Sequence, residues 1–217
     1  MCSAADHPEV VQEYIAKECA EQCTMGPFDP SKLPEVQTTR FRVIPKRNSN
    51  GWWLVLDLSS PEGWSMNNGI NLDLCSLSYV TIDDAARAIV ESSPGSKLAK
   101  IDIKSAYRIV PVHLEDCPLL GMIWGEGLYV DAVLPLGLHS ALKIFTALAN
   151  DLECVIKGEG VQTVLHYLDD FLIVAATNSK QFEEDLQKLL GHLRQAAHTT
   201  CYRESRRAGG SPDFSGN

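Results

Sequence analysis

The fold is decided by the stretch Gln162-Thr-Val-Leu-His-Tyr167-Leu168-Asp169-Asp170-Phe171-Leu-Ile-Val-Ala175. Two runs of apolar and β-branched residues flank two adjacent carboxylates, a pattern that predicts a β-hairpin with Asp169 and Asp170 at or beside its turn. Two like charges in an apolar hairpin are costly unless cations neutralise them. The pair therefore predicts a divalent-metal site, although a solvated polar turn is the alternative that this stretch leaves open.

Outward from this hairpin, the neighbouring segments predict further strands and helices. A strand over Leu98–Asp102 ends in a third acid, and Gly125-Glu126-Gly127 predicts the turn of a second hairpin between 119–124 and 128–134. A single apolar face predicts a helix from Leu138 to Ile156 that Gly158 ends, and Asn178 is expected to cap another helix that continues to Leu193. This order predicts an α+β fold in which helices cover one face of an antiparallel sheet.

The three acids then converge at one edge of the predicted sheet. Asp102 ends one strand, and Asp169 and Asp170 lie at a hairpin. Three carboxylates suit two Mg²⁺ ions, which prefer oxygen ligands and substrate phosphates. The chemistry that this arrangement predicts is phosphoryl transfer, most simply nucleotidyl transfer.

The N-terminal part predicts a helix followed by a basic hairpin. Asp6–Gln22 has helical periodicity, and Gly26-Pro27 after it is expected to end the helix. Strands over Phe41–Pro45 and Trp52–Leu58 flank the turn Lys46–Gly51. Arg40–Trp53 carries basic residues and no acid, so it is a candidate phosphate-facing surface, with a solvated basic loop as the equal alternative. Thr81 and Asp84 predict a capping box that opens a short helix.

Composition limits the class of protein. The 217 residues carry a net charge of -9, which argues against a general nucleic-acid binder. Seven cysteines without regular spacing predict reduced thiols, and a zinc site at His7, Cys19 and Cys23 is less favoured than cysteines on a helix face. With no signal peptide or membrane span in the pattern, we expect an intracellular protein, in the cytoplasm or nucleus.

Three motifs in order resemble those of a known enzyme family. Lys100-Ile-Asp102-Ile-Lys-Ser-Ala-Tyr107-Arg-Ile-Val-Pro111-Val-His113, then Leu134-Pro-Leu-Gly137-Leu-His-Ser140, then His166-Tyr-Leu-Asp169-Asp170-Phe-Leu resemble motifs A, B and C of reverse transcriptases. The chain is most similar to the enzymes of DIRS-like retrotransposons, which share segments such as Asp57-Leu-Ser-Ser-Pro61-Glu-Gly63 and Leu74-Cys-Ser-Leu-Ser-Tyr79-Val. The resemblance covers about His7 to Leu193.

The resemblance implies a role for each matched residue. Asp102, Asp169 and Asp170 would hold two Mg²⁺ or Mn²⁺ ions, Tyr107 would exclude a 2′-hydroxyl, and Gly137 and Lys46 would contact the incoming dNTP. Ser140, Tyr167 and Leu168 complete the motifs around them. The implied partners are an RNA or DNA template, a primer strand and dNTPs, with no membrane, and a separate thumb-bearing or ribonuclease H-bearing partner is conceivable.

The chain also departs from the family pattern. Trp53 stands where the family usually has an arginine that grips the triphosphate, and Leu136 and Leu142 replace other usual motif B residues. The resemblance predicts an N-terminal helical segment over 1–36, fingers over 37–97, a palm over 98–193 and a divergent, disordered tail over 194–217, with the thumb missing. The alternative to an active enzyme is a catalytically dead retroelement remnant that at most binds nucleic acid.

Overall fold

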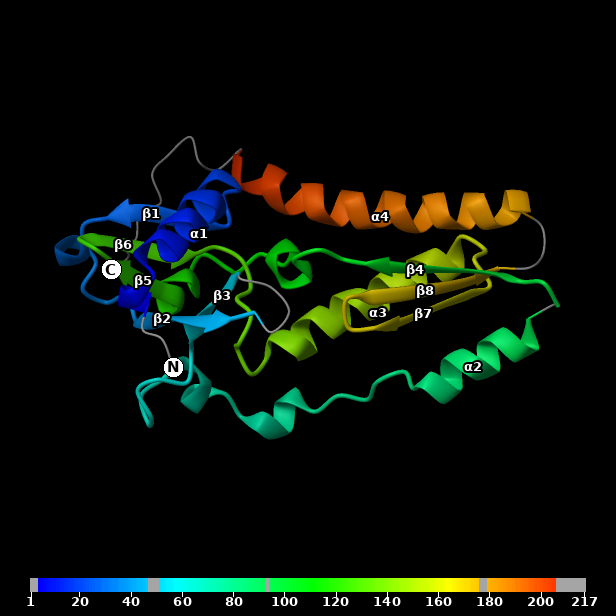
Figure 1. The fold of residues 1–217 in the computed structure, drawn as a ribbon, viewed down its shortest axis with the longest axis horizontal. Helices are drawn as coiled ribbons and strands as arrows, with labels where there is room; N and C mark the ends of the chain where they lie inside the picture. The colour runs from blue at the N-terminus through cyan, green and yellow to red at the C-terminus, as the bar shows by residue number, and fades with distance from the viewer. Residues whose placement is uncertain (1–3, 47–50, 93, 176–178, 206–217) are drawn as a thin grey trace. The chain divides into compact units, whose positions relative to one another are not determined.

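In the computed structural model, residues 4–46, 51–92, 94–175 and 179–205 are described. The chain forms two compact units, each built from segments that are separate in the sequence (Figure 1). Unit 1 comprises residues 1–72, 107–141 and 200–217, and unit 2 comprises residues 73–106 and 142–199. The resemblance predicts contiguous fingers over 37–97 and a palm over 98–193, and that division stays a prediction.

Unit 1 contains a sheet that has, in the described part of the chain, five strands in the order β1-β6-β5-β2-β3. The strands are β1 (Thr24–Phe28), β2 (Thr38–Pro45), β3 (Trp52–Asp57), β5 (Gly121–Trp124) and β6 (Gly127–Asp131), and helix α1 spans Pro8–Ala20. In β2, buried and exposed residues alternate, so Phe41 and Val43 enter a core that includes Val11 and Ile15 of α1. The predicted helix and both hairpins are confirmed, while residues 47–50 of the basic turn lie outside the described residues.

The second hairpin does not belong to the sheet in which the sequence analysis placed it. We expected one antiparallel sheet, but the described strands form two, and β5 pairs in parallel with β2 through Thr38 and Gly121. Gly121 allows this approach, because a Cβ atom there would lie 2.8 Å from the carbonyl oxygen of Gln37. The sequence also did not predict β1, whose Gly26-Pro27 pair resembled a helix terminator.

Unit 2 contains a second sheet in the order β4-β8-β7, and all of its strand pairs are antiparallel. Its elements are β4 (Lys97–Asp102), β7 (Thr163–Tyr167), β8 (Asp170–Ala175), α2 (Ile82–Glu91), α3 (Ala141–Gly158) and most of α4 (Ser179–Ser205). Helices cover one face: His166 of β7 contacts α3, and Lys97 of β4 lies over the ring of Phe182 in α4 (Figure 1). The predicted α+β fold, with helices on one face of an antiparallel sheet, is confirmed here.

One helix begins as predicted, and another extends further than the sequence indicates. Thr81 and Asp84 form the predicted capping box of α2. Helix α4 continues to Ser205, past Leu193, the last apolar residue that its periodicity placed inside it. Asn178, its predicted cap, lies outside the described residues. Among the described helices, none combines the length and the apolar character that a membrane crossing requires.

Candidate active site

The register of the second sheet places Asp102 and Asp170 directly opposite each other on β4 and β8. Residues opposite each other on antiparallel strands point to the same face, with Cβ atoms about 4.5–5.5 Å apart. Tyr167 of β7 lies opposite Asp170 on its other side, so one row across the sheet contains Asp102, Asp170 and Tyr167. The ring of Tyr167 packs against Tyr79, with ring centroids 5.3 Å apart.

Asp169 enters the site through the turn between β7 and β8. The turn residues are Leu168 and Asp169, and Leu168 has a φ of 54°, a conformation that residues with a branched side chain rarely adopt. The carbonyl oxygen of Asp169 accepts a hydrogen bond of 3.0 Å from the backbone N–H of Ile103. This bond joins Asp169 to the residue that follows Asp102, so the structure brings the three predicted aspartates to one end of the sheet.

Backbone strain accompanies both motifs that supply the acids. In the described part of the chain, the non-glycine residues with positive φ are Gln22, Ser105 and Leu168. Ser105 lies between Asp102 and Tyr107, and Leu168 precedes Asp169. Such conformations persist where the surrounding structure enforces them, and they cluster at functional sites.

Lys100 is the cation that the structure places among these acids. Its Nζ lies 2.9 Å from Oδ2 of Asp170, and both side chains are partly open to solvent. The pKa of Lys100 is raised, first by its hydrogen bond and charge interaction with Asp170 and then by the charges of Asp102 and Asp169. The ammonium group of Lys100 therefore interacts electrostatically with all three carboxylates. Lys100 belongs to the motif A stretch, but its sequence position alone assigns it no role.

The donor set fits the divalent metal ions that the resemblance implies. All three side chains offer carboxylate oxygens, the ligand type that Mg²⁺ and Mn²⁺ prefer. The Nζ of Lys100 contacts Asp170 alone among them at 2.9 Å, and its side chain is exposed, so the pair is weak and leaves the carboxylates open to a stronger cation. Asp102, Asp169 and Asp170 are the residues that would hold the ions.

The reverse face of the hairpin is fixed to α3 through His166. This side chain is buried, and its Nε2 lies 2.9 Å from Oδ1 of Asn150. Burial lowers the pKa of His166, with the nearby carboxylate of Glu153 acting in the opposite direction. The hydrogen bond orients the strand that carries Tyr167.

Unit 1 contains the predicted nucleotide-contacting residues, and Gly137 is held by a side chain that the sequence analysis missed. Gly137 has a φ of 105°, which favours glycine, and a Cβ there would lie only 3.5 Å from the oxygen of Leu56. Buried Asn67 donates from Nδ2 to the carbonyl oxygen of Gly137 at 2.9 Å and accepts from the N–H of His139 at 2.8 Å. Ser140 is half-buried in the turn that precedes α3.

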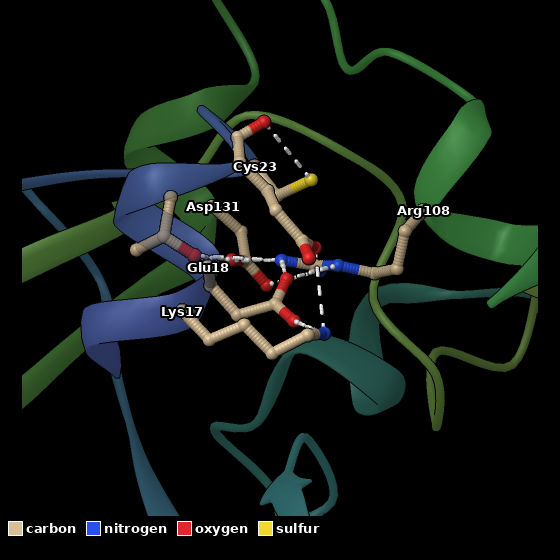
Figure 2. Close-up of polar contacts among 7 residues, drawn as sticks. Lys17, Glu18, Cys23, Arg108 and Asp131 are labelled. Carbon is tan, nitrogen blue, oxygen red and sulfur yellow. Dashed lines mark hydrogen bonds and ion pairs between the residues drawn. The ribbon is translucent and has the colours of Figure 1, made fainter. Parts of the chain in front are cut away.

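Tyr107 lies in a 3-10 turn, Ala106–Ile109, which Arg108 anchors (Figure 2). The Arg108 guanidinium binds Asp131 through Nη1 and Nη2 at 2.9 Å each, and its Nε lies 2.9 Å from Oε2 of Glu18. Burial alone would lower the pKa of Arg108, but hydrogen bonds and charge interaction with Asp131 hold it above its usual range. The half-buried ring of Tyr107 is thus attached to a rigid turn.

The same cluster contains a group that resembles a metal site by spacing alone. Among the described residues, the ligand atoms that lie within 4.8 Å of one another belong to Glu18, Glu21 and Cys23 rather than to the three aspartates. Lys17 lies 3.3 Å from both Glu18 and Glu21, and Arg108 also binds Glu18 (Figure 2). Protein cations already neutralise these carboxylates, so the group does not offer a metal site.

Lys46 and Trp53 form a pair at the end of the β2–β3 hairpin. The Nζ of Lys46 lies 4.3 Å from the centroid of a Trp53 ring, and Trp53 is 59% exposed. The aromatic face attracts the ammonium group, and it holds the lysine beside the tryptophan. The resemblance implies an arginine at the position of Trp53, and the described residues place this aromatic side chain beside Lys46 there.

The chain is similar to proteins of a known family over most of its second half and part of its first. Residues 71–200, more than half of the chain, match the family described as "Reverse transcriptase (RNA-dependent DNA polymerase)". The chain belongs to the reverse transcriptase family. This range includes the three aspartates, Tyr107 and Gly137 but not Lys46. No curated protein sequence matches this reverse transcriptase chain.

Solved structures of foamy virus enzymes share the fold. The chain resembles the foamy viral protease-reverse transcriptase in complex with double-stranded DNA (TM-score 0.65, 19% identity) and with an RNA/DNA hybrid (TM-score 0.65, 16% identity). The prototype foamy virus CSH mutant gives a TM-score of 0.62 at 20% identity. These matches cover 86–91% of this reverse transcriptase chain but only 22–29% of the viral chains, and they correspond to the fingers and palm region.

Proposed function

We propose that this chain supplies the fingers and palm of a retrotransposon reverse transcriptase, most similar to DIRS-type enzymes. The reaction is template-directed transfer of a nucleotide from a dNTP to a primer 3′-hydroxyl. The observation that carries the proposal is the arrangement of Asp102, Asp169 and Asp170 at one end of the β4-β8-β7 sheet, where all three act on one cation.

Each residue has a stated task in this proposal. Asp102, Asp169 and Asp170 hold two Mg²⁺ or Mn²⁺ ions, and ions in such a site activate the attacking oxygen and stabilise the leaving oxygen. Tyr107, on its anchored turn, excludes the 2′-hydroxyl of a ribonucleotide. Gly137, whose carbonyl Asn67 fixes, allows close backbone approach to the nucleotide. These tasks follow from the motif positions.

The partners are an RNA or DNA template, a primer strand and dNTPs. The foamy virus enzymes were solved with double-stranded DNA and with an RNA/DNA hybrid, which supports this class of ligand. The cysteines Cys19, Cys23, Cys75, Cys117 and Cys154 form no disulfide, and together with the dNTP substrates they favour a reaction inside a cell.

Primer extension on an RNA template with Mg²⁺ or Mn²⁺ tests the proposal. Asp169→Asn should lower the rate about a hundredfold or more, because a metal site contributes several kcal/mol and each 1.36 kcal/mol is a factor of ten. Asp151→Asn is the matched control, since Asp151 is exposed on α3. A chain that binds primer-template but extends nothing, with or without Asp169, would instead support the inactive remnant.

Nucleotide binding by calorimetry separates the sugar and phosphate contacts. Tyr107→Val should reduce the preference for dNTP over the matching ribonucleotide, whereas Tyr107→Phe should keep it because the ring remains. Trp53→Arg should tighten triphosphate binding about tenfold or more, since a charge-assisted hydrogen bond contributes about 1.5–3 kcal/mol. An unchanged sugar preference in Tyr107→Val would count against the role of this ring.

A further inference from the structure

Lys100 and Asp102 belong to the same face of β4, because side chains two residues apart in a strand point the same way. The row one step along the sheet from Asp102 and Asp170 contains Lys100 and, opposite it, Leu172. Lys100 reaches diagonally from this row to Asp170, with Nζ 2.9 Å from Oδ2. A cation is therefore built into the strand that carries the first acid of the site.

We propose that Lys100 is an internal counter-ion of the aspartates, which pairs with Asp170 when no metal is bound and leaves it when a divalent cation enters. The inference rests on the metal site of the proposed function. It adds a competitor to that site, with a defined effect on metal affinity and on the stability of the metal-free protein.

A counter-ion is useful here because three carboxylates lie close together in the metal-free site. Asp102 lies opposite Asp170, and Asp169 is adjacent to Asp170 in the chain, so the metal-free site concentrates like charges. Like charges at this spacing oppose one another, and a positive group beside them relieves that repulsion.

The exposure of Lys100 makes the pairing reversible. Its side chain is 67% exposed, and that of Asp170 is 35% exposed, so water can solvate the ammonium group once it leaves. Exposed ion pairs are weak, and a flexible four-carbon stem lets the ammonium swing away. A divalent metal ion carries two charges and can contact several carboxylates, whereas Lys100 carries one charge and contacts Asp170. The metal ion can therefore displace the Lys100 ammonium group.

The size of the effect follows from how often the pair is formed. Because exposed ion pairs are weak, the stronger of them are formed about four-fifths of the time, which leaves a metal-competent fraction of about one-fifth. Replacing Lys100 by Met, which keeps the length of the stem and removes the charge, then raises the apparent metal affinity about fivefold. Lys100→Arg keeps a cation at this place, so its metal affinity should stay at or below that of the unchanged chain.

Mn²⁺ binding to the full chain, followed by electron paramagnetic resonance of the free ion, tests the inference without any activity. Lys100→Met should bind Mn²⁺ about fivefold more tightly than the unchanged chain. Lys97→Met is the matched control, because Lys97 is on the same strand and loses the same charge but lies over the ring of Phe182. Its Mn²⁺ affinity should stay within about twofold.

Thermal unfolding supplies a second readout. Lys100→Met without metal should melt at a lower temperature than the unchanged chain, and added Mn²⁺ should raise its melting temperature by more, because tighter binding to the folded state stabilises it further. Lys97→Met should show the same response to Mn²⁺ as the unchanged chain.

The outcomes separate this inference from the proposed function. If Asp170→Asn loses Mn²⁺ binding while Lys100→Met binds no more tightly than Lys97→Met, the metal site stands and the counter-ion is wrong. If Asp169→Asn and Asp170→Asn both bind Mn²⁺ like the unchanged chain, the metal site itself is wrong and the inference falls with it.

Discussion

Replacing Arg108 by Met removes the charge at the centre of unit 1. The guanidinium makes four polar contacts of 2.7–2.9 Å, two with Asp131 and two with Glu18. Asp131 is 0% exposed and Glu18 is 3% exposed, so water does not replace the lost partner. Removing one member of a buried ion pair leaves an uncompensated charge and costs about 3–5 kcal/mol.

Urea unfolding of the full chain measures this cost. At a typical slope of about 2 kcal/mol per molar, a loss of about 4 kcal/mol lowers the midpoint by about 2 M. Arg87→Met is the matched control: Arg87 is exposed, its partner Asp84 lies 3.3 Å away, and exposed pairs contribute about 0–1 kcal/mol.

Two results would refute the reasoning about Arg108. A loss below about 1 kcal/mol in Arg108→Met would mean that the guanidinium is not the partner of these acids. The double variant Arg108→Met with Asp131→Asn should be less destabilised than the sum of the single variants, because the uncompensated charge is gone. Simple additivity would show that the two residues are not coupled.

Three further changes have defined outcomes. Leu168→Ile should lower the free energy of unfolding by about 1–2 kcal/mol, because a β-branched residue resists the φ of 54°, whereas Leu172→Ile in the adjacent strand should have little effect; both are read by urea unfolding. Asn67→Ala should cost about 1–2 kcal/mol in the same assay and weaken dNTP binding by calorimetry, because it releases Gly137. The pKa of His166 is lowered below 6.5 in the folded state, so the unfolded chain takes up more protons just below pH 6.5; stability should fall as pH drops through that window, and His166→Gln should remove this part of the slope.

Local patterns predicted the acidic hairpin well. The runs of apolar and β-branched residues on both sides of Asp169-Asp170 match β7 and β8 as the structure has them. The apolar face of α3 and the capping box of α2 were readable for the same reason: each depends on residues within four positions of one another. The resemblance to motif A identified Asp102 as a candidate site residue. The register of β4 with β8 places it opposite Asp170.

Long-range partners were beyond the reach of these patterns. Arg108 lies 90 residues from Glu18 and 23 from Asp131, and no local spacing connects them. Gly26 resembled a helix terminator, but a Cβ there would lie 2.8 Å from the oxygen of Leu128, so this glycine permits close strand pairing. The parallel pairing of Thr38 with Gly121 has the same cause, a close backbone approach that only the fold reveals.

The net charge of -9 and the proposed phosphate chemistry become compatible once the charges are located. Arg108 is bound to Glu18 and Asp131 inside unit 1, and Arg42 of the basic hairpin lies 2.6 Å from Asp57. These cations neutralise the protein's own acids, so they are poorly available to phosphate. Among the described residues, the cation that pairs with the acids at the end of β4 and β8 is the exposed ammonium of Lys100, a weak partner. Positive charge for a triphosphate would therefore come mainly from metal ions at these aspartates, which is why the proposed function depends on the aspartates and not on a basic face.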